Sequence, residues 1–276
     1  MSAHGGNIYD FALPGDMIDF SSNINPYGPP ACGMEAARSA LALIQRYPDT
    51  GQSAVRDAFS GWLDVEPERL VFGNGASEII SAVIAALAPS RVVAAAPTFS
   101  DYAESARRHG VPVSEILTYA VDGFAFPMDE IEKVISAGDL FIACQPNNPT
   151  GRVWTEGELR SLAGICASKG AWLMADECFV NLTYPRAFSC LSLVGERVVI
   201  VRAITKDFSA PGLRVGFAIS SPSVASRIRD AMQPWPLNCV GEAFAIACAS
   251  EAEPFLSDSA RKISAEWARL TKGLKI

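Results

Sequence analysis

Val198–Lys206 reads Val-Val-Ile-Val-Arg-Ala-Ile-Thr-Lys. The apolar run from Val198 to Val201 predicts a buried strand, and Lys206 follows this run on a short polar turn. A lysine at such a place can face a pocket and be partly desolvated. Its amine becomes nucleophilic once its pKa has fallen far enough for the proton to leave. Most lysines between a strand and a loop are merely solvated. Other motifs in the chain are therefore needed to distinguish a nucleophilic lysine from a solvated one.

The same unit of a short apolar strand and a turn recurs along the chain. The predicted strands are Arg91–Ala96, Leu140–Cys144, Trp172–Asp176, Val198–Ala203 and Val215–Ile219. The predicted helices between them are Glu35–Leu43, Ser53–Leu63, Ser77–Leu87, Tyr102–His109 and Glu156–Ser168. Strands that are apolar throughout are typical of a mainly parallel sheet covered by helices on both faces. We therefore expect an α/β protein with three layers, α/β/α, and a site at the carboxyl ends of the strands.

Three regions are predicted along the chain. Residues 1–30 are rich in Gly, Pro and Asn and form an irregular arm over the active site, and residues 31–230 form the large domain. Residues 231–276 begin a small C-terminal domain, with helical patterns from about Val240 to Ala249 and from Pro254 onward. The last pattern reaches Ile276 without a helix stop signal.

Composition excludes several classes of function. Of the 276 residues 49% are hydrophobic and 19% charged, which is typical of a globular protein with a sizeable core. The net charge of −7 argues against a nucleic-acid partner. The apolar stretch Ile79–Leu87 is far too short to cross a bilayer, so no membrane partner is expected.

The first residues lack the basic and apolar segments of a secretory signal, and we expect cytoplasmic residence. Seven cysteines form no Cys-x-x-Cys pair, so no metal site is expected.

Several motifs follow the predicted strands, and each has an ordinary alternative. Gly73–Glu78 (Gly-Asn-Gly-Ala-Ser-Glu) opens a helix and could bind phosphate through its backbone N–H groups, or it could be a plain helix cap. Phe99 could stack on a flat ring or belong to the core. Asn148, in the turn Asn-Asn-Pro-Thr-Gly, could donate to a phenolate-type oxygen or simply belong to a good turn. Asp176 ends a buried strand, where it could keep a ring nitrogen protonated or form a salt bridge.

Taken together, these motifs favour a shared function over the ordinary alternative for each motif. Pyridoxal phosphate needs a lysine that traps its aldehyde, an acid at its pyridine nitrogen and a cradle for its phosphate. Lys206 supplies the first, Asp176 the second, and the glycine-rich turn with Arg214 the third. The combination predicts a pyridoxal 5'-phosphate enzyme in which Lys206 and Asp176 are the catalytic residues.

The motifs from Tyr47 to Arg214 resemble the pyridoxal-phosphate enzymes of the aspartate aminotransferase fold (fold type I), within them the histidinol-phosphate aminotransferase branch. The resemblance implies that the cofactor is bound by Tyr47, Gly75, Ala76, Ser77, Phe99, Asn148, Asp176, Thr205, Lys206 and Arg214. In that branch the tyrosine reaches the phosphate in the neighbouring subunit, which implies a homodimer. The chain departs from the family pattern at Cys178, Phe179 and Ala203. The family continues beyond the position of Ile276 with a segment that supplies its substrate-binding arginines, so the resemblance implies that the small C-terminal domain is incomplete here. None of the arginines near the C-terminus of this chain matches those positions.

The arm narrows the choice of reaction. His-Gly-Gly-Asn at His4 and Ser-Ser-Asn-Ile-Asn-Pro at Ser21–Pro26 resemble the threonine-phosphate decarboxylases of cobalamin biosynthesis. This implies that L-threonine O-3-phosphate is decarboxylated to (R)-1-amino-2-propanol O-2-phosphate, with His4, Asn25 and Asn148 contacting this small phosphorylated substrate. Two alternatives stay open. The chain could be a histidinol-phosphate-type aminotransferase, or a shortened and inert protein of the same fold.

Overall fold

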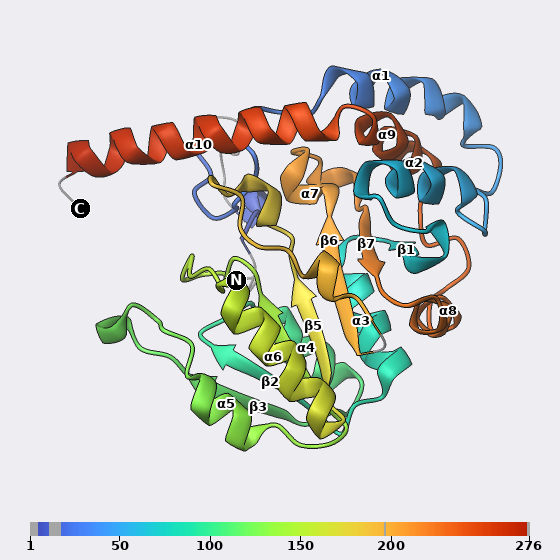
Figure 1. The fold of residues 1–276 in the computed structure, drawn as a ribbon. Helices are drawn as coiled ribbons and strands as arrows, with labels where there is room; N and C mark the ends of the chain where they lie inside the picture. Colours follow the sequence, from blue (N-terminus) through green and yellow to red (C-terminus); the bar gives the residue numbers. More distant parts are fainter. Residues whose placement is uncertain (1–4, 11–17, 196, 275–276) are drawn as a thin grey trace.

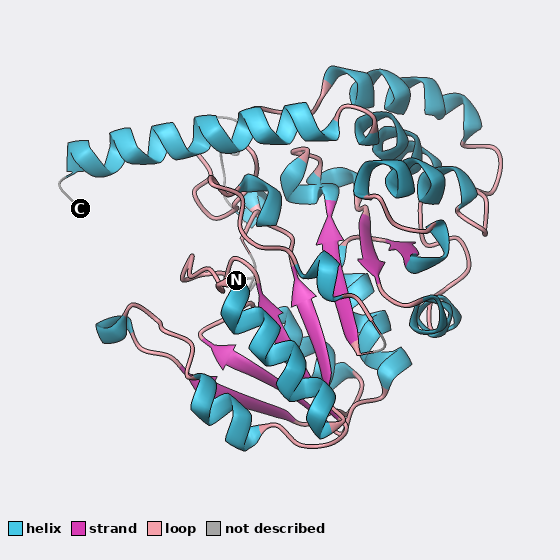
Figure 2. Ribbon diagram, viewed as in Figure 1, coloured by secondary structure: helices cyan, strands magenta, loops and turns pink. Residues whose placement is uncertain are grey.

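A computed structural model describes residues 5–10, 18–195 and 197–274. Its centre is a 7-stranded sheet in the order β1-β7-β6-β5-β4-β2-β3. The strands are β1 Leu70–Gly73, β2 Arg91–Ala96, β3 Val113–Leu117, β4 Asp139–Cys144, β5 Trp172–Asp176, β6 Val198–Ala203 and β7 Gly216–Ile219. Every neighbouring pair is parallel except the two that β7 makes with β1 and β6. The predicted mainly parallel sheet is confirmed, and Figure 2 shows it enclosed by helices.

The α-helices occupy most of the segments between the strands. They are α1 Ala31–Ala40, α2 Ser53–Leu63, α3 Ala76–Leu87, α4 Asp101–Arg108, α5 Met128–Val134, α6 Glu156–Lys169, α7 Ile204–Asp207, α8 Pro222–Asp230, α9 Cys239–Ala249 and α10 Ala252–Leu274. The helix α6 begins with a capping box in which Thr155 and Glu158 bond reciprocally, and it ends at Gly170 with φ 72°. No helix among those described is long and apolar enough to cross a membrane.

Alternate side chains of the sheet enter two separate cores. One face packs on α3, α4 and α8, with Val71, Ile80 and Ile142 in its core. The other face packs on α2, α6 and α9, where Phe59 and Phe141 are fully buried. Figure 1 shows α5 and α6 in front of the sheet and α3 and α4 behind it. The predicted three-layer arrangement is therefore confirmed.

Some elements were not predicted, and each is short or partly exposed. Among them, β1 has four residues and α5 has seven. The edge strand β3 buries little more than Ile116, so its sequence lacks a continuous apolar run. The predicted strand at Val215 begins one residue later, at Gly216.

The C-terminal helices differ in their contacts. The helix α9 packs against α1 and α2, and its Phe244 belongs to the same core as Phe59. The helix α10 begins in that core at Leu256 and then projects beyond the rest of the chain (Figure 1). Trp267 and Leu274 on the projecting part are 66% and 65% exposed. The domain boundary at residue 231 stays a prediction.

The directions of the strands bring the loops that carry polar residues to one edge of the sheet. The parallel strands β2, β4, β5 and β6 end at the same edge of the sheet, at Ala96, Cys144, Asp176 and Ala203. Because β7 runs the opposite way, it begins at this edge, with Gly216 opposite both Ala203 and Gly73. The segments that follow β1, β2, β4, β5 and β6 and the one that precedes β7 therefore meet there.

We expect Phe217→Ala to lower the free energy of unfolding by about 3–5 kcal/mol, because it leaves a cavity between Phe59 and Phe72. The Phe217 ring centroid lies 5.0 Å from that of Phe59 and 5.4 Å from that of Phe72. Phe20→Ala is the matched control, since Phe20 is 92% exposed. Urea unfolding of both variants measures the difference, and equal losses would contradict the assigned core.

Candidate functional site

A cavity of about 630 Å³ lies at the edge where the strand ends meet. It brings together the predicted residues Ala76, Ser77, Phe99, Asn148, Asp176, Thr205, Lys206 and Arg214. Residues that were not predicted as site residues also line it, namely Gly5, Ser21, Ser22, Asn23, Thr98, Ser100, Asp101, Arg108, Cys144, Pro149, Cys178, Phe179 and Ala203. The arm, the glycine-rich turn and the loops after β2, β4, β5 and β6 thus share one pocket.

Asp176 is 5% exposed at the end of β5. Burial raises the pKa of its carboxyl group, while hydrogen bonds from Tyr102 and Cys178 oppose that rise. The Tyr102 hydroxyl donates to Oδ2 at 2.7 Å, and the Cys178 backbone N–H donates to Oδ1 at 3.1 Å. A cation or a protonated ring nitrogen next to Asp176 would relieve its buried charge. Tyr102 was predicted only as part of a helix.

Lys206 lies on α7, directly after β6. Burial lowers the pKa of its amine, and the positive charge of Arg214 lowers it further, whereas Cys178 and Asp19 act in the opposite direction. The Nζ atom lies 6.0 Å from the centroid of the Phe179 ring. A lysine with a lowered pKa can hold a neutral, nucleophilic amine at a pH where an exposed lysine is protonated.

The glycine-rich turn and Arg214 are in close contact. Gly75 has φ 82°, and a Cβ atom at this position would lie 2.3 Å from Nη2 of Arg214. A Cβ atom at Gly216 would likewise collide with the Gly75 backbone, at 2.4 Å from its carbonyl carbon. Both positions therefore need glycine. Gly75 caps α3 without a side-chain acceptor, so the first N–H groups of this helix and the guanidinium can bind the same anion.

Asn148 lies on a loop that Asn147 holds in place. The Asn147 amide donates to the Pro97 carbonyl at 2.9 Å and to the Thr150 hydroxyl at 2.8 Å. Its own oxygen accepts from Thr98 at 2.8 Å. These bonds join the loop after β4 to the loop after β2, which carries Phe99, and they leave the neighbouring Asn148 at the pocket wall.

The arm reaches the pocket, but not through the asparagine we predicted. Asn25 is 1% exposed, and its amide donates to the Asp207 carbonyl at 2.9 Å. Its carboxamide oxygen accepts from the Tyr27 N–H at 3.1 Å. The side chain is thus held by the protein, and the substrate contact at Asn25 stays a prediction. Asn23, two residues earlier, lines the pocket instead. The predicted contact at His4 lies outside the described residues.

Tyr47 does not line this pocket. It is 79% exposed and stacks on Trp235, with ring centroids 4.4 Å apart. A role at the neighbouring subunit's phosphate stays a prediction. Among the described residues, no group of three or more His, Cys, Asp or Glu side chains is arranged to hold a metal ion.

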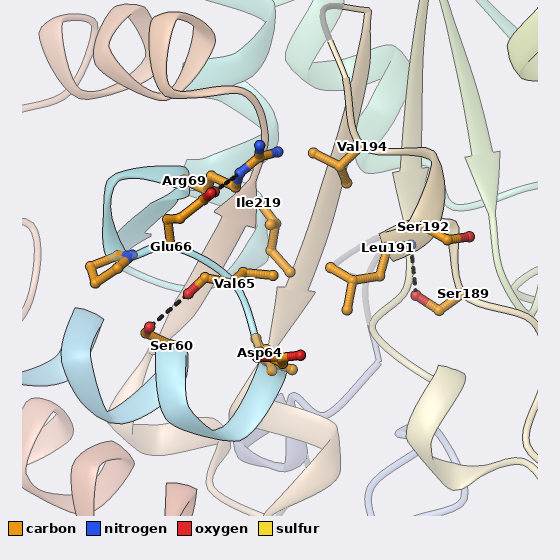
Figure 3. Close-up of a pocket in the computed structure, with 12 residues that line it drawn as sticks. Ser60, Asp64, Val65, Glu66, Arg69, Ser189, Leu191, Ser192, Val194 and Ile219 are labelled. Carbon is orange, nitrogen blue, oxygen red and sulfur yellow. Dashed lines mark hydrogen bonds and ion pairs between the residues drawn. The ribbon is translucent and has the colours of Figure 1, made fainter.

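A second cavity, of about 940 Å³, lies near the opposite edge of the sheet. It is lined by residues that precede β1 and β6, such as Arg69 and Val194, and by Ile219 at the end of β7. Figure 3 shows that some of its polar groups are paired with one another, including Arg69 with Glu66. The described residues that line it include no lysine, and its acids Asp64 and Glu66 are exposed, so we assign the chemistry to the first pocket.

We expect an amine-reactive reagent to modify Lys206 with a pH midpoint below the value of about 10.4 for an exposed lysine, because only the neutral amine reacts. Arg214→Gln removes a repelling charge and should raise this midpoint. Arg38→Gln makes the same charge change on the surface of α1 and should leave it unaltered. Peptide mass mapping of cofactor-free protein measures all three, and a midpoint that Arg214→Gln leaves in place would refute the electrostatic assignment.

Curated proteins similar to this chain include both decarboxylases and aminotransferases. The chain is 30% identical to a threonine-phosphate decarboxylase from Salmonella typhimurium, over 87% of this chain and 68% of that protein. It is 31% identical to a histidinol-phosphate aminotransferase from Bacillus subtilis, over 84% of this chain and 65% of that protein. The chain thus spans about two thirds of the length of these curated relatives.

Solved structures share the fold. A histidinol-phosphate aminotransferase from Clostridium acetobutylicum superposes with a TM-score of 0.85 at 27% identity, covering 94% of this chain and 77% of that one. An aspartate aminotransferase from Thermus thermophilus gives a TM-score of 0.83 at 22% identity, covering 92% of this chain and 71% of that one, and at this identity it shows the fold alone. The predicted fold type I is therefore confirmed.

The pocket fits the cofactor of these relatives, pyridoxal phosphate. This cofactor needs three groups, and the pocket offers all of them: the anion cradle that only glycine can form at Gly75, the buried acid Asp176, and the amine of Lys206, whose pKa is lowered by burial. Residues 15–276 match the family model for aminotransferase class I and II. This chain belongs to the aminotransferase class I and II family and depends on pyridoxal phosphate.

Proposed function

We propose that the protein decarboxylates L-threonine O-3-phosphate to (R)-1-amino-2-propanol O-2-phosphate in cobalamin biosynthesis. The observation that carries this proposal is that Ser21, Ser22 and Asn23 of the arm line the same pocket as Lys206 and Asp176. This part of the arm contains the motif that resembles the threonine-phosphate decarboxylases. The similarity to the Salmonella typhimurium protein of that name supports the same reaction.

The roles of the residues follow from their surroundings. Bound pyridoxal phosphate supplies an aldehyde and a ring that accepts the electron pair of a broken bond. Lys206 would hold the cofactor through its amine, whose pKa is lowered by burial. Asp176 would keep the ring nitrogen protonated, supported by the bond from Tyr102. Arg214 and the first turn of α3, with Ser77, would bind the phosphate. Asn148 would donate to the phenolic oxygen.

The choice of reaction depends on how the substrate is held. In a decarboxylation the substrate carboxylate leaves as CO₂, and the α-carbon takes up a proton. In a transamination the α-carbon loses its proton instead, and the amino group passes to a keto acid. Both reactions use the same lysine and the same acid, so the contacts to the substrate carboxylate decide between them. Asn23 and Ser22 line the pocket from the arm, and we propose that they make such contacts.

A histidinol-phosphate-type aminotransferase is the second candidate. Its support is the 31% identity to the Bacillus subtilis enzyme, which is comparable with the similarity to the decarboxylase. This candidate requires an amino acceptor such as 2-oxoglutarate, whereas the decarboxylase requires none.

We expect threonine phosphate to release one CO₂ per molecule consumed, without any keto acid, and Lys206→Ala to abolish this release. Lys262→Ala, at a lysine exposed on α10, is the control and should retain activity. Consumption of 2-oxoglutarate with histidinol phosphate, in the absence of CO₂ release from threonine phosphate, would establish the second candidate instead.

We further propose that the protein acts as a homodimer through a surface near Tyr47. Four large apolar side chains are exposed there, with Leu41 at 57%, Leu43 at 47%, Ile44 at 67% and Tyr47 at 79%. An apolar cluster of this kind on a folded protein favours a contact with another chain. A dimer through this surface would bring Tyr47 to the neighbouring subunit.

Ile44→Glu should convert the dimer into a monomer, because it buries a carboxylate in the proposed contact. Val121→Glu is the matched control at a residue that is 96% exposed, and it should leave the mass unchanged. Light scattering after size-exclusion chromatography measures both. A wild-type monomer, or a dimer that survives Ile44→Glu, would exclude this surface.

A further inference from the structure

Lys206 stands on a very short element. The helix α7, Ile204–Asp207, is a single turn, and one turn of helix is not stable by itself. Its position therefore depends on contacts with the rest of the chain. The apolar side is anchored by Ile204 and the following Phe208, which are 1% and 0% exposed. Asp207 supplies a polar anchor next to the lysine.

The side chain of Asp207 is buried at 4% exposure. Its Oδ2 atom accepts from Nδ2 of Asn181 at 2.7 Å, and Asn181 is itself 4% exposed. Asn181 lies on the 3-10 turn Val180–Leu182, four residues beyond Glu177 in the loop that follows β5. This bond therefore ties the segment that carries Lys206 to the segment that carries Asp176.

The Asp207 carboxyl group is hydrogen-bonded to an amide, and the positively charged side chains near it are paired with other acids. Burial raises the pKa of Asp207 to about 7, although the Asn181 bond and the charges of Arg202 and Arg186 lower it. Both arginines are bonded elsewhere, Arg202 to Glu177 at 2.7 Å and Arg186 to Glu253 at 2.9 Å. The other oxygen, Oδ1, has no hydrogen-bond partner within the described part of the chain. The Asn181 amide is thus the group that fixes this carboxyl.

The arm binds the backbone of the same two residues. The Asn25 N–H donates to the Lys206 carbonyl at 3.2 Å, and the Asn25 amide donates to the Asp207 carbonyl at 2.9 Å. Asn25, Asn181 and Asp207 thus form one unit, which we name the lysine clamp. It joins the arm, the loop after β5 and α7.

We propose that Asp207 is a positioning residue that, with Asn181 and Asn25, fixes Lys206 in the pocket and couples its position to the docking of the arm. None of the three clamp residues lines the pocket, so they act through Lys206 rather than on the substrate. The inference rests on the proposed function in one respect, namely that Lys206 is the cofactor-binding lysine.

Exchanging the side chains of Asn181 and Asp207 tests the lysine clamp. Asn181→Asp places two carboxyl groups opposite each other and should break the bond. Adding Asp207→Asn to this variant restores an amide–carboxylate pair with the same net charge as the wild type. We expect Asn181→Asp to speed hydrogen exchange in a peptide covering residues 23–27 by roughly tenfold or more, and the double variant to return it toward the wild-type rate. A peptide from β4 is the control and should not change.

A second variant leaves every charge in place. Asn25→Leu removes the amide of the arm, and we expect it to raise the pH midpoint for modification of Lys206, because a lysine released toward water regains its ordinary pKa. Unchanged exchange in Asn181→Asp, a double variant that stays as perturbed as the single one, or an unmoved midpoint in Asn25→Leu would overturn the proposal. These readouts need no turnover, so a failed decarboxylase assay would leave them valid.

Discussion

The burial of Asp176 at the end of β5 is the constraint on which the rest of the site depends. A carboxyl group at the buried end of a strand is costly unless it receives hydrogen bonds, and the Tyr102 hydroxyl and the Cys178 N–H supply them. These donors come from α4 and from the loop after β5, so both segments are held against the strand end. Because β4 and β6 flank β5, Asn148 and Lys206 follow on either side of this acid.

The antiparallel direction of β7 brings Arg214 to the phosphate side of the predicted site. If β7 were parallel to its neighbours, its start would lie at the opposite edge, near Leu70 and Val198. Instead β7 starts beside the end of β1, with Gly216 opposite Gly73. Arg214 therefore reaches the first turn of α3, and the missing side chains of Gly75 and Gly216 allow the guanidinium and the two backbones to approach closely. A cation and a helix N-terminus meet there as one anion site.

Patterns in the sequence predicted features that depend on local residues. The strands β2, β5 and β6 have the predicted bounds because each contains a continuous apolar run, whereas the half-exposed β3 lacks such a run. The residues after the strand ends were likewise identified from their motifs. Tyr102 was missed as a site residue because its partner Asp176 is 74 residues away. Asn25 was predicted only as a substrate contact, because nothing in the local sequence reveals that its amide donates to the Asp207 carbonyl, 182 residues away.

The residues predicted to bind the cofactor do not by themselves determine whether the reaction is a decarboxylation or a transamination. Relatives that differ in activity match this chain to a similar degree, and both reactions need the same electron-accepting ring. Selection must then come from groups that hold the substrate's carboxylate rather than the cofactor. Polar groups that line the described pocket outside the predicted cofactor set include Ser22 and Asn23 on the arm and Arg108 on α4. Asn25 ties the arm to the backbone of Lys206 and Asp207. The same hydrogen bonds therefore position Ser22 and Asn23 and the backbone of the lysine.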